Sequence, residues 1–188
     1  MRPVIRRFVK ILLGVTGGIA AYKACELTSL AVKAGHEVQV ILTPNAARFV
    51  GPLSFEALSG RRVMTGTFDD ALAHIELARW ADVAVVAPLS AHTLGKLACG
   101  LADDALTTTL MALPRGRPCV LAPAMNTEMW FNPVVVRNLK WLDELDRYTI
   151  VAPIEKRLAC GDVGPGGLAE PLDILDAATA ARSSTHPG

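Results

Sequence analysis

Residues 9–18, VKILLGVTGG, form an apolar run that ends in glycines, which is the pattern of a buried strand in a parallel sheet. Residues 20–35 then place apolar side chains at helical spacing and close on Gly35. A strand, a glycine turn and a helix therefore follow one another. Residues 82–89, DVAVVAPL, give the strongest strand pattern of the chain, and strands and helices continue to alternate around it.

This alternation predicts an α/β fold: a Rossmann-like (flavodoxin-like), doubly wound parallel sheet in a three-layer α/β/α arrangement. We expect one domain over residues 1–188, folded from about 9 to 180. Further strands are expected at 37–43, 117–125 and 148–153, with a weaker edge strand at 61–68. Helices are expected at 52–60, 75–81, 90–113 (one or two), 132–145 and 172–181, with a glycine-rich loop before the last and a disordered polar tail from 182.

The composition argues against several classes of partner. The net charge is +1 and aromatic residues make up 5%, which favours neither nucleic acid nor a membrane surface. The basic and apolar start could pass for a signal peptide, but Gly14 interrupts the apolar run early. No apolar stretch is long enough to cross a bilayer, and we expect a cytoplasmic protein.

The cysteines do not form a metal-binding pattern. None of the four stands in a Cys-x-x-Cys pair and no histidine cluster accompanies them, so no metal site is expected. Cys25, Cys99 and Cys119 lie in apolar runs and are interpreted as small buried hydrophobes. Cys160 differs, because glycines follow it in a loop.

Ligands of doubly wound sheets bind at the carboxyl ends of the strands, and small and polar residues gather at those places here. Gly17 and Gly18 can present backbone N–H groups to a phosphate, and Thr43 ends the second strand without an acidic residue, which favours a mononucleotide over NAD. Taken alone, the glycine turn could equally be structural. His74 could reach the same edge, and an imidazole suits acid–base chemistry, although a lone histidine is more often structural.

Two further strand ends carry polar side chains with two open interpretations. Ser90 and Thr93 open a helix, so Ser90 could be only its N-cap. Asn126 could likewise be a cap, with Met125 and Met129 as core residues.

These stretches and residues 157–164, RLACGDVG, together resemble one family, the homo-oligomeric flavin-containing cysteine decarboxylases. Residues 88–100 are similar to its Pro-x-Ser-Ala-Asn-Thr motif, and residues 123–130, PAMNTEMW, match its Pro-x-Met-Asn-x-x-Met-Trp motif in full. Residues 156–171 resemble the substrate-covering flap of phosphopantothenoylcysteine decarboxylases, most closely the free-standing form. The resemblance extends from about residue 9 to about 180.

The resemblance implies non-covalently bound FMN. It also implies a homotrimer, or a dodecamer built from such trimers, in which a neighbouring subunit completes each site. It implies a substrate that ends in cysteine, bound by Asn126, Met129, Cys160 and Gly161. The residues implied to bind FMN are Gly17, Gly18, Ile19, Thr43, Phe49, Pro88, Ser90, Thr93 and Met125.

The implied reaction is an oxidative decarboxylation. A cysteine carboxylate has no electron sink for the carbanion left by loss of CO2, and oxidation of the thiol end by FMN would create one. By resemblance, His74 is the base at the cysteine end and Asn126 binds the carboxylate. The enethiolate is then reduced to a saturated thiol with the electrons held on reduced FMN, and Cys160 is the proton donor of that step. The flap glycines would let Cys160 close over the substrate.

Three positions depart from the family pattern: His92 replaces the motif asparagine, Gly167 replaces an arginine or alanine, and Leu168 replaces a methionine. The preferred substrate is 4'-phosphopantothenoylcysteine, which would give 4'-phosphopantetheine for coenzyme A biosynthesis. A peptidyl-cysteine decarboxylase that makes a C-terminal aminoenethiol in natural-product biosynthesis remains open. A phosphatase-inhibitory binding protein would carry an acidic tail, which residues 181–188 are not, and a flavin prenyltransferase would lack the ACGD flap.

Overall fold

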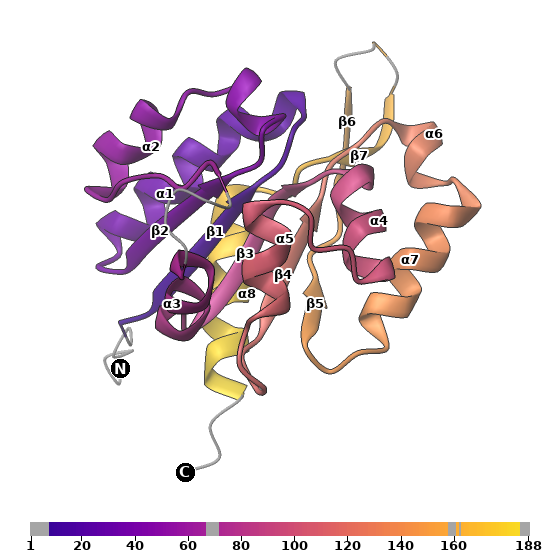
Figure 1. The fold of residues 1–188 in the computed structure, drawn as a ribbon. Helices are drawn as coiled ribbons and strands as arrows, with labels where there is room; N and C mark the ends of the chain where they lie inside the picture. Colours follow the sequence, from indigo (N-terminus) through magenta and orange to yellow (C-terminus); the bar gives the residue numbers. More distant parts are fainter. Residues whose placement is uncertain (1–7, 67–71, 158–160, 162, 185–188) are drawn as a thin grey trace, which may run out of the picture.

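The computed structural model describes residues 8–66, 72–157, 161 and 163–184, with only the backbone at 182–184. Five parallel strands form one sheet in the order β2-β1-β3-β4-β5, so the prediction of a doubly wound parallel sheet is confirmed (Figure 1). The order reverses between β1 and β3, which creates a switch point at their carboxyl ends. The strands are β1 (Lys10–Val15), β2 (Glu37–Leu42), β3 (Val83–Leu89), β4 (Cys119–Pro123) and β5 (Tyr148–Ile150).

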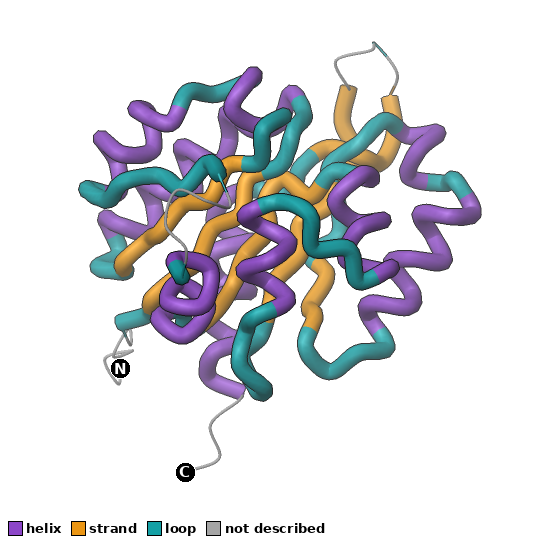
Figure 2. The backbone as a smooth tube through the Cα atoms, viewed as in Figure 1, coloured by secondary structure: helices purple, strands orange, loops and turns teal. Residues whose placement is uncertain are grey.

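Helices cover both faces of the sheet (Figure 2). On one face lie α1 (Lys23–Lys33) and α8 (Pro171–Ser184), with α2 (Pro52–Ser59) against α1. On the other lie α3 (Ala73–Trp80), α4 (Ala91–Cys99), α5 (Ala105–Met111) and α7 (Pro133–Asp143). Three short helices lie at strand ends: η1 (Ile19–Tyr22), η2 (Ala46–Arg48) and α6 (Thr127–Trp130).

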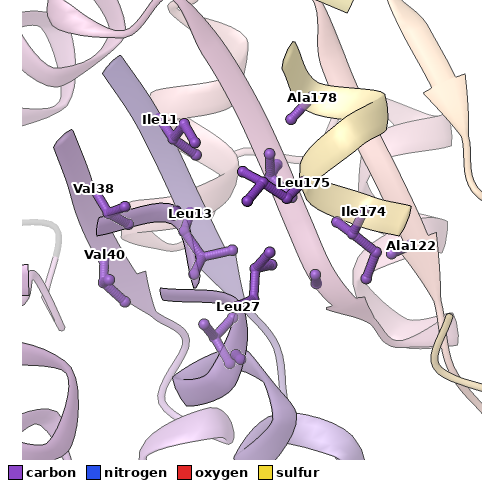
Figure 3. Packing of buried hydrophobic residues seen from close by; sticks show 14 of the residues in the cluster. Ile11, Leu13, Leu27, Val38, Val40, Ala122, Ile174, Leu175 and Ala178 are labelled. Atoms are coloured by element: carbon purple, nitrogen blue, oxygen red, sulfur yellow. The ribbon is translucent and has the colours of Figure 1, made fainter. Parts of the chain in front are cut away.

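The sheet separates two apolar clusters, because successive strand residues point to opposite faces. Ile11 and Leu13 of β1 pack with Leu27 of α1 and Leu175 of α8 (Figure 3), while Leu12 belongs to the cluster under α4 and α5. Every residue of β3 is buried. Both layers thus hold the central strands, and their carboxyl ends, in place.

Local signals explain why the helices begin and end where they do. Asp104 forms a capping box with Thr107 at the start of α5. Gly100 adopts φ +70°, which ends α4 and divides residues 90–113 into two helices. Pro133 stands at the start of α7, directly after the N-cap Asn132.

The segment expected as a glycine-rich loop is in part a β-hairpin. Strands β6 (Ile154–Arg157) and β7 (Val163–Gly167) pair antiparallel and project beyond the sheet (Figure 1). Gly166 takes φ +136° where the register shifts, a conformation that side chains rarely adopt. Glycines here allow a bulged hairpin, which period-two patterning of apolar residues could not reveal.

Three smaller expectations were wrong. Within 61–66 the chain forms only an isolated bridge from Met64 to Ile41, not an edge strand. The polar tail begins later than expected, because α8 continues to Ser184; residues 185–188 lie outside the described part. Cys99 is exposed and Cys25 is half-buried; only Cys119 is fully buried, and burial raises the pKa of its thiol to about 12.

Candidate active site

A cavity of about 460 Å³ lies at the switch point between β1 and β3. Its walls come from the turn after β1, the ends of β3 and β4, and the β6–β7 hairpin. The lining residues that matter below are Thr16, Gly17, Gly18, Ile19, Lys23, Pro88, Ser90, Met125, Asn126, Met129, Lys156, Arg157 and Gly167.

The glycine turn after β1 forms one wall. A Cβ on Gly17 would lie 2.5 Å from the Cβ of Asn45, so the turn fits against its neighbour only without a side chain. A Cβ on Gly18 would meet no protein atom within 4 Å, and Gly18 lines the cavity. Glycine at 18 therefore leaves space on the cavity side for a ligand to approach the backbone.

Thr16 connects the ends of β1 and β3. Its hydroxyl donates to the Pro88 carbonyl at 2.7 Å and accepts from the Ser90 N–H at 2.8 Å. The side chain is fully buried. Sequence reasoning missed Thr16, because a threonine directly after a strand resembles any strand terminus until the second strand end is placed beside it.

The start of α4 supplies Ser90, whose hydroxyl accepts from the Thr93 N–H at 3.3 Å. Ser90 is therefore the N-cap that the sequence allowed, and it also lines the cavity. Thr93 is buried beneath it and does not line the cavity.

The end of β4 supplies Met125, Asn126 and Met129. Asn126 is the N-cap of α6, and its Oδ1 accepts from the Glu128 N–H at 2.8 Å. This bond orients the side-chain amide at the cavity wall. Met129, 46% exposed, lines the cavity one turn later and is not a core residue.

Within the described part of the chain, two hydrogen bonds join the hairpin to the end of β4. The Met125 N–H donates to the Gly166 carbonyl at 2.9 Å, and the Thr127 hydroxyl donates to the Pro165 carbonyl at 3.0 Å. A Cβ on Gly164 would lie 2.9 Å from Thr127 Oγ1, so the two segments pack closely. The hairpin thus forms a fixed wall of the cavity at its base.

Positive charge lines the hairpin side of the cavity, which sequence reasoning also missed. Lys23 of α1 and Lys156 and Arg157 of β6 all line it. Burial, and then the nearby Lys23 ammonium, lower the pKa of Lys156, while Glu170 acts in the opposite direction. Because these lysines are far apart in the sequence, only the fold brings them together.

Several predicted residues do not line this cavity. Thr43 is buried and accepts from the Ala46 N–H at 3.2 Å, and Phe49 is 53% exposed beyond η2. His74 lies in the first turn of α3, and its buried Nδ1 has no hydrogen-bond partner among the described residues. Gly161 is exposed at φ +97°, and Cys160 lies outside the described residues.

The described residues show no metal-binding group of three or more histidine, cysteine or acidic side chains. Among the helices that the structure describes, none is both long and apolar enough to span a bilayer.

The cavity suits a flavin mononucleotide. The open backbone at Gly18 fits a phosphate, and the apolar side chains of Ile19, Pro88 and Met125 fit a planar ring system. The volume of about 460 Å³ lies within the range typical of cofactor sites.

Comparisons with known proteins agree with this geometry. A family model described as Flavoprotein matches residues 5–183. The chain is 51% identical over 169 residues to the coenzyme A biosynthesis bifunctional protein CoaBC of Bacillus subtilis, a match that covers 88% of this chain and 41% of the relative. The chain therefore spans well under half the length of this curated relative.

Two solved structures are similar over nearly their whole length. A PPC decarboxylase mutant complexed with pantothenoylaminoethenethiol superposes with a TM-score of 0.81 at 41% identity, covering 91% of this chain and 96% of that one. The FMN-binding protein AtHal3 gives a TM-score of 0.80 at 40% identity, covering 95% and 98%.

Proposed function

Because the chain belongs to the Flavoprotein family, we propose that it is an FMN-dependent cysteine decarboxylase that converts 4'-phosphopantothenoylcysteine to 4'-phosphopantetheine. One observation carries the proposal: the switch-point cavity is bounded by the glycine turn, the PAMNTEMW segment and strands β6 and β7, which flank residues 158–162 in the sequence. The relatives named for PPC decarboxylase and coenzyme A biosynthesis support the substrate, and their biosynthetic role supports a cytoplasmic location.

FMN would be held by cavity-lining residues of three strand ends. These are Gly17, Gly18, Ile19, Pro88, Ser90 and Met125. Thr43 and Thr93 do not line the cavity, and their hydrogen bonds with the Ala46 N–H and with Ser90 would hold the turns around it. Phe49, 53% exposed, would contact FMN from outside this set. When bound, FMN supplies the hydride acceptor that a cysteine thiol end requires before its carboxylate can leave.

Asn126 would bind the carboxylate that is lost as CO2. Its oxygen is held by the Glu128 N–H, so its amide hydrogens are the groups suited to an anion. Met129 lines the cavity beside it and would bound the space for the cysteine end. An amide binds the carboxylate through hydrogen bonds and without a full opposite charge, so neutral CO2 can leave while the electron pair of the broken bond passes into the oxidised thiol end of the substrate.

His74 would act as the base in a site of a neighbouring subunit. It does not line the cavity of its own chain. Exposed apolar side chains offer a surface for a second copy: Ile19 and Tyr22, which line the cavity, and Phe49 and Leu53. A homotrimer, or a dodecamer built from such trimers, would bring His74 of one subunit to the cavity of the next. Cys160, which precedes Gly161 in the sequence and lies outside the described residues, would donate a proton to the product.

The test is to incubate the purified flavoprotein with 4'-phosphopantothenoylcysteine and, separately, with peptides that end in cysteine, and to measure CO2. Release from the small molecule alone is expected. Release from the peptides alone would instead assign the chain to peptidyl-cysteine decarboxylation, and release from neither would refute a cysteine decarboxylase.

A further inference from the structure

We propose that Lys156 forms, with Lys23, a subsite for the phosphomonoester end of the substrate, and that Gly167 is the positioning residue that gives Lys156 its place. This inference rests on the proposed function and deepens it, because it names the groups that would separate a phosphorylated small molecule from a peptide.

The two lysines share one wall of the cavity. Lys156 is half-buried on β6, pairs across the hairpin with Gly164, and lines the cavity. Lys23 begins α1, lines the same cavity, and has a side chain that is only 13% exposed. Two lysine side chains that line one cavity, one of them largely buried, attract an anion.

Gly167 determines where the Lys156 side chain lies. A Cβ on Gly167 would lie 2.5 Å from Lys156 Cε and 2.8 Å from both Cδ and Cγ. The lysine stem therefore crosses directly over the buried glycine, and any side chain at 167 would push it aside. This explains why position 167 is a glycine where the family that the chain resembles has arginine or alanine. The space that a side chain at 167 would need is occupied by the Lys156 side chain of the opposite strand.

The local charge balance leaves the wall positive. No acidic residue lines the cavity among the residues that the structure describes. Glu170, 56% exposed, places its Oε1 3.4 Å from Lys23 Nζ. Burial and the Lys23 ammonium lower the pKa of Lys156, so a dianion between the lysines would relieve an unfavourable charge pair.

A phosphomonoester could come from the substrate or from FMN. We assign the subsite to the substrate, because Lys156 lies on β6 at the start of the segment 156–171 that resembles a substrate-covering flap, whereas the phosphate of FMN fits the open backbone at Gly18. The two sources are separated by measuring the bound flavin.

The experiment compares 4'-phosphopantothenoylcysteine with its dephosphorylated form on the holoenzyme. For Lys156→Gln we expect kcat/KM on the phosphorylated substrate to fall about 10- to 100-fold, mainly through KM, as for loss of one charge-assisted hydrogen bond. On the dephosphorylated form the change should stay within about 2-fold, and FMN content should be unchanged. Lys156→Arg should retain most activity, and the exposed Lys140→Gln on α7 is the matched control.

The role of Gly167 is tested by Gly167→Ala. We expect a KM increase for the phosphorylated substrate alone, and no further loss when it is combined with Lys156→Gln, because both act through one ammonium. An additive double variant would overturn the positioning role.

Other outcomes overturn the subsite without touching the proposed reaction. Equal losses of kcat/KM on both substrates would mean that Lys156 does not recognise the phosphate. Loss of flavin from Lys156→Gln would assign the lysine to the cofactor. If the wild-type protein releases CO2 from neither substrate, the proposed function fails and this inference fails with it.

Discussion

Thr16 is a single residue that holds the turn after β1 against the end of β3, so two walls of the cavity depend on it. Its hydroxyl joins the Pro88 carbonyl to the Ser90 N–H, and both groups belong to the end of β3 and the turn after it. The bonds are buried, where an unpaired polar group is expensive. Thr16 thus positions Pro88 and Ser90, which line the cavity, and it lines the cavity itself.

We predict that Thr16→Val lowers the free energy of unfolding by about 1–3 kcal/mol and weakens FMN retention, because the Ser90 N–H loses its acceptor. Denaturant unfolding and flavin content after gel filtration measure the two effects. Thr109→Val is the matched control, because that buried hydroxyl donates only to the Ala105 carbonyl of its own helix. Equal losses in both variants would show that burial of a valine, not the connection between strands, is responsible.

Asp104 is a residue whose charge stabilises the fold at the start of α5. Burial raises its pKa, but hydrogen bonds from Lys96 and Thr107 outweigh burial and lower the pKa overall. Lys96 Nζ lies 2.8 Å from Asp104 Oδ2 and 2.7 Å from Asp103 Oδ1. A lowered carboxyl pKa means that the charged form stabilises the fold above its ordinary pKa, and that this stability is lost as the pH falls through the lowered value.

Asp104→Asn should therefore cost about 1–3 kcal/mol at pH 7, and the difference from wild type should shrink as the pH falls below about 4. Unfolding by urea across that pH range measures it. Asp103→Asn, at a side chain that is 63% exposed, should cost less. A cost for Asp104→Asn that does not change with pH would contradict the role of the charge.

The β6–β7 hairpin is the element that adds a wall to the cavity at the carboxyl ends of the strands. Its base is held to the end of β4 through the Met125 N–H and the Thr127 hydroxyl. Both bonds reach hairpin carbonyls near Gly166, where the register shifts. The hairpin can therefore be loosened at its base without unfolding the sheet.

Thr127→Val should increase amide hydrogen exchange in residues 154–157 and 163–167 several-fold, while the five-stranded sheet stays protected. One of the two bonds to the hairpin is removed, and Met125 remains as the other. Thr149→Val on β5, an exposed threonine, is the control. If exchange rises equally across β1 and β3, the mutation destabilises the whole fold and the hairpin is not an independent unit.

At the scale of the whole molecule, the cavity of a single chain is not lined by His74. In the proposed trimer a neighbour would supply this residue, so a site would combine Asn126 of one subunit with His74 of another. Symmetric assemblies make such shared sites possible because each subunit contributes both halves.

This arrangement predicts complementation between two inactive variants. Trimers co-expressed from His74→Asn and Asn126→Ala chains should regain about a quarter of wild-type activity, since one site in four draws both intact residues. Activity assays on the mixed protein, with light scattering for its mass, test this. Each variant alone should stay inactive, and His74→Asn should keep its bound FMN. A mixed protein as inactive as its parents would place both residues in the same subunit's site.

The sequence by itself determined the layered α/β fold. Apolar runs such as 82–89 can be buried only inside a sheet that is covered on both faces, and the glycines after 9–16 require a turn into a helix. It also pointed to the strand ends as the place of the ligand, and to the segments around Gly18, Ser90 and Asn126, all of which line the cavity.

Only the tertiary structure decided which of these residues meet. Thr16 bonds to the end of β3, and Lys23 and Lys156 line the same cavity, although these residues are far apart in the chain. Gly167 leaves space for the Lys156 side chain across a bulged hairpin. Periodicity reports only the face on which a residue lies. Contacts between separate elements depend on strand order and register, which short-range patterns do not encode.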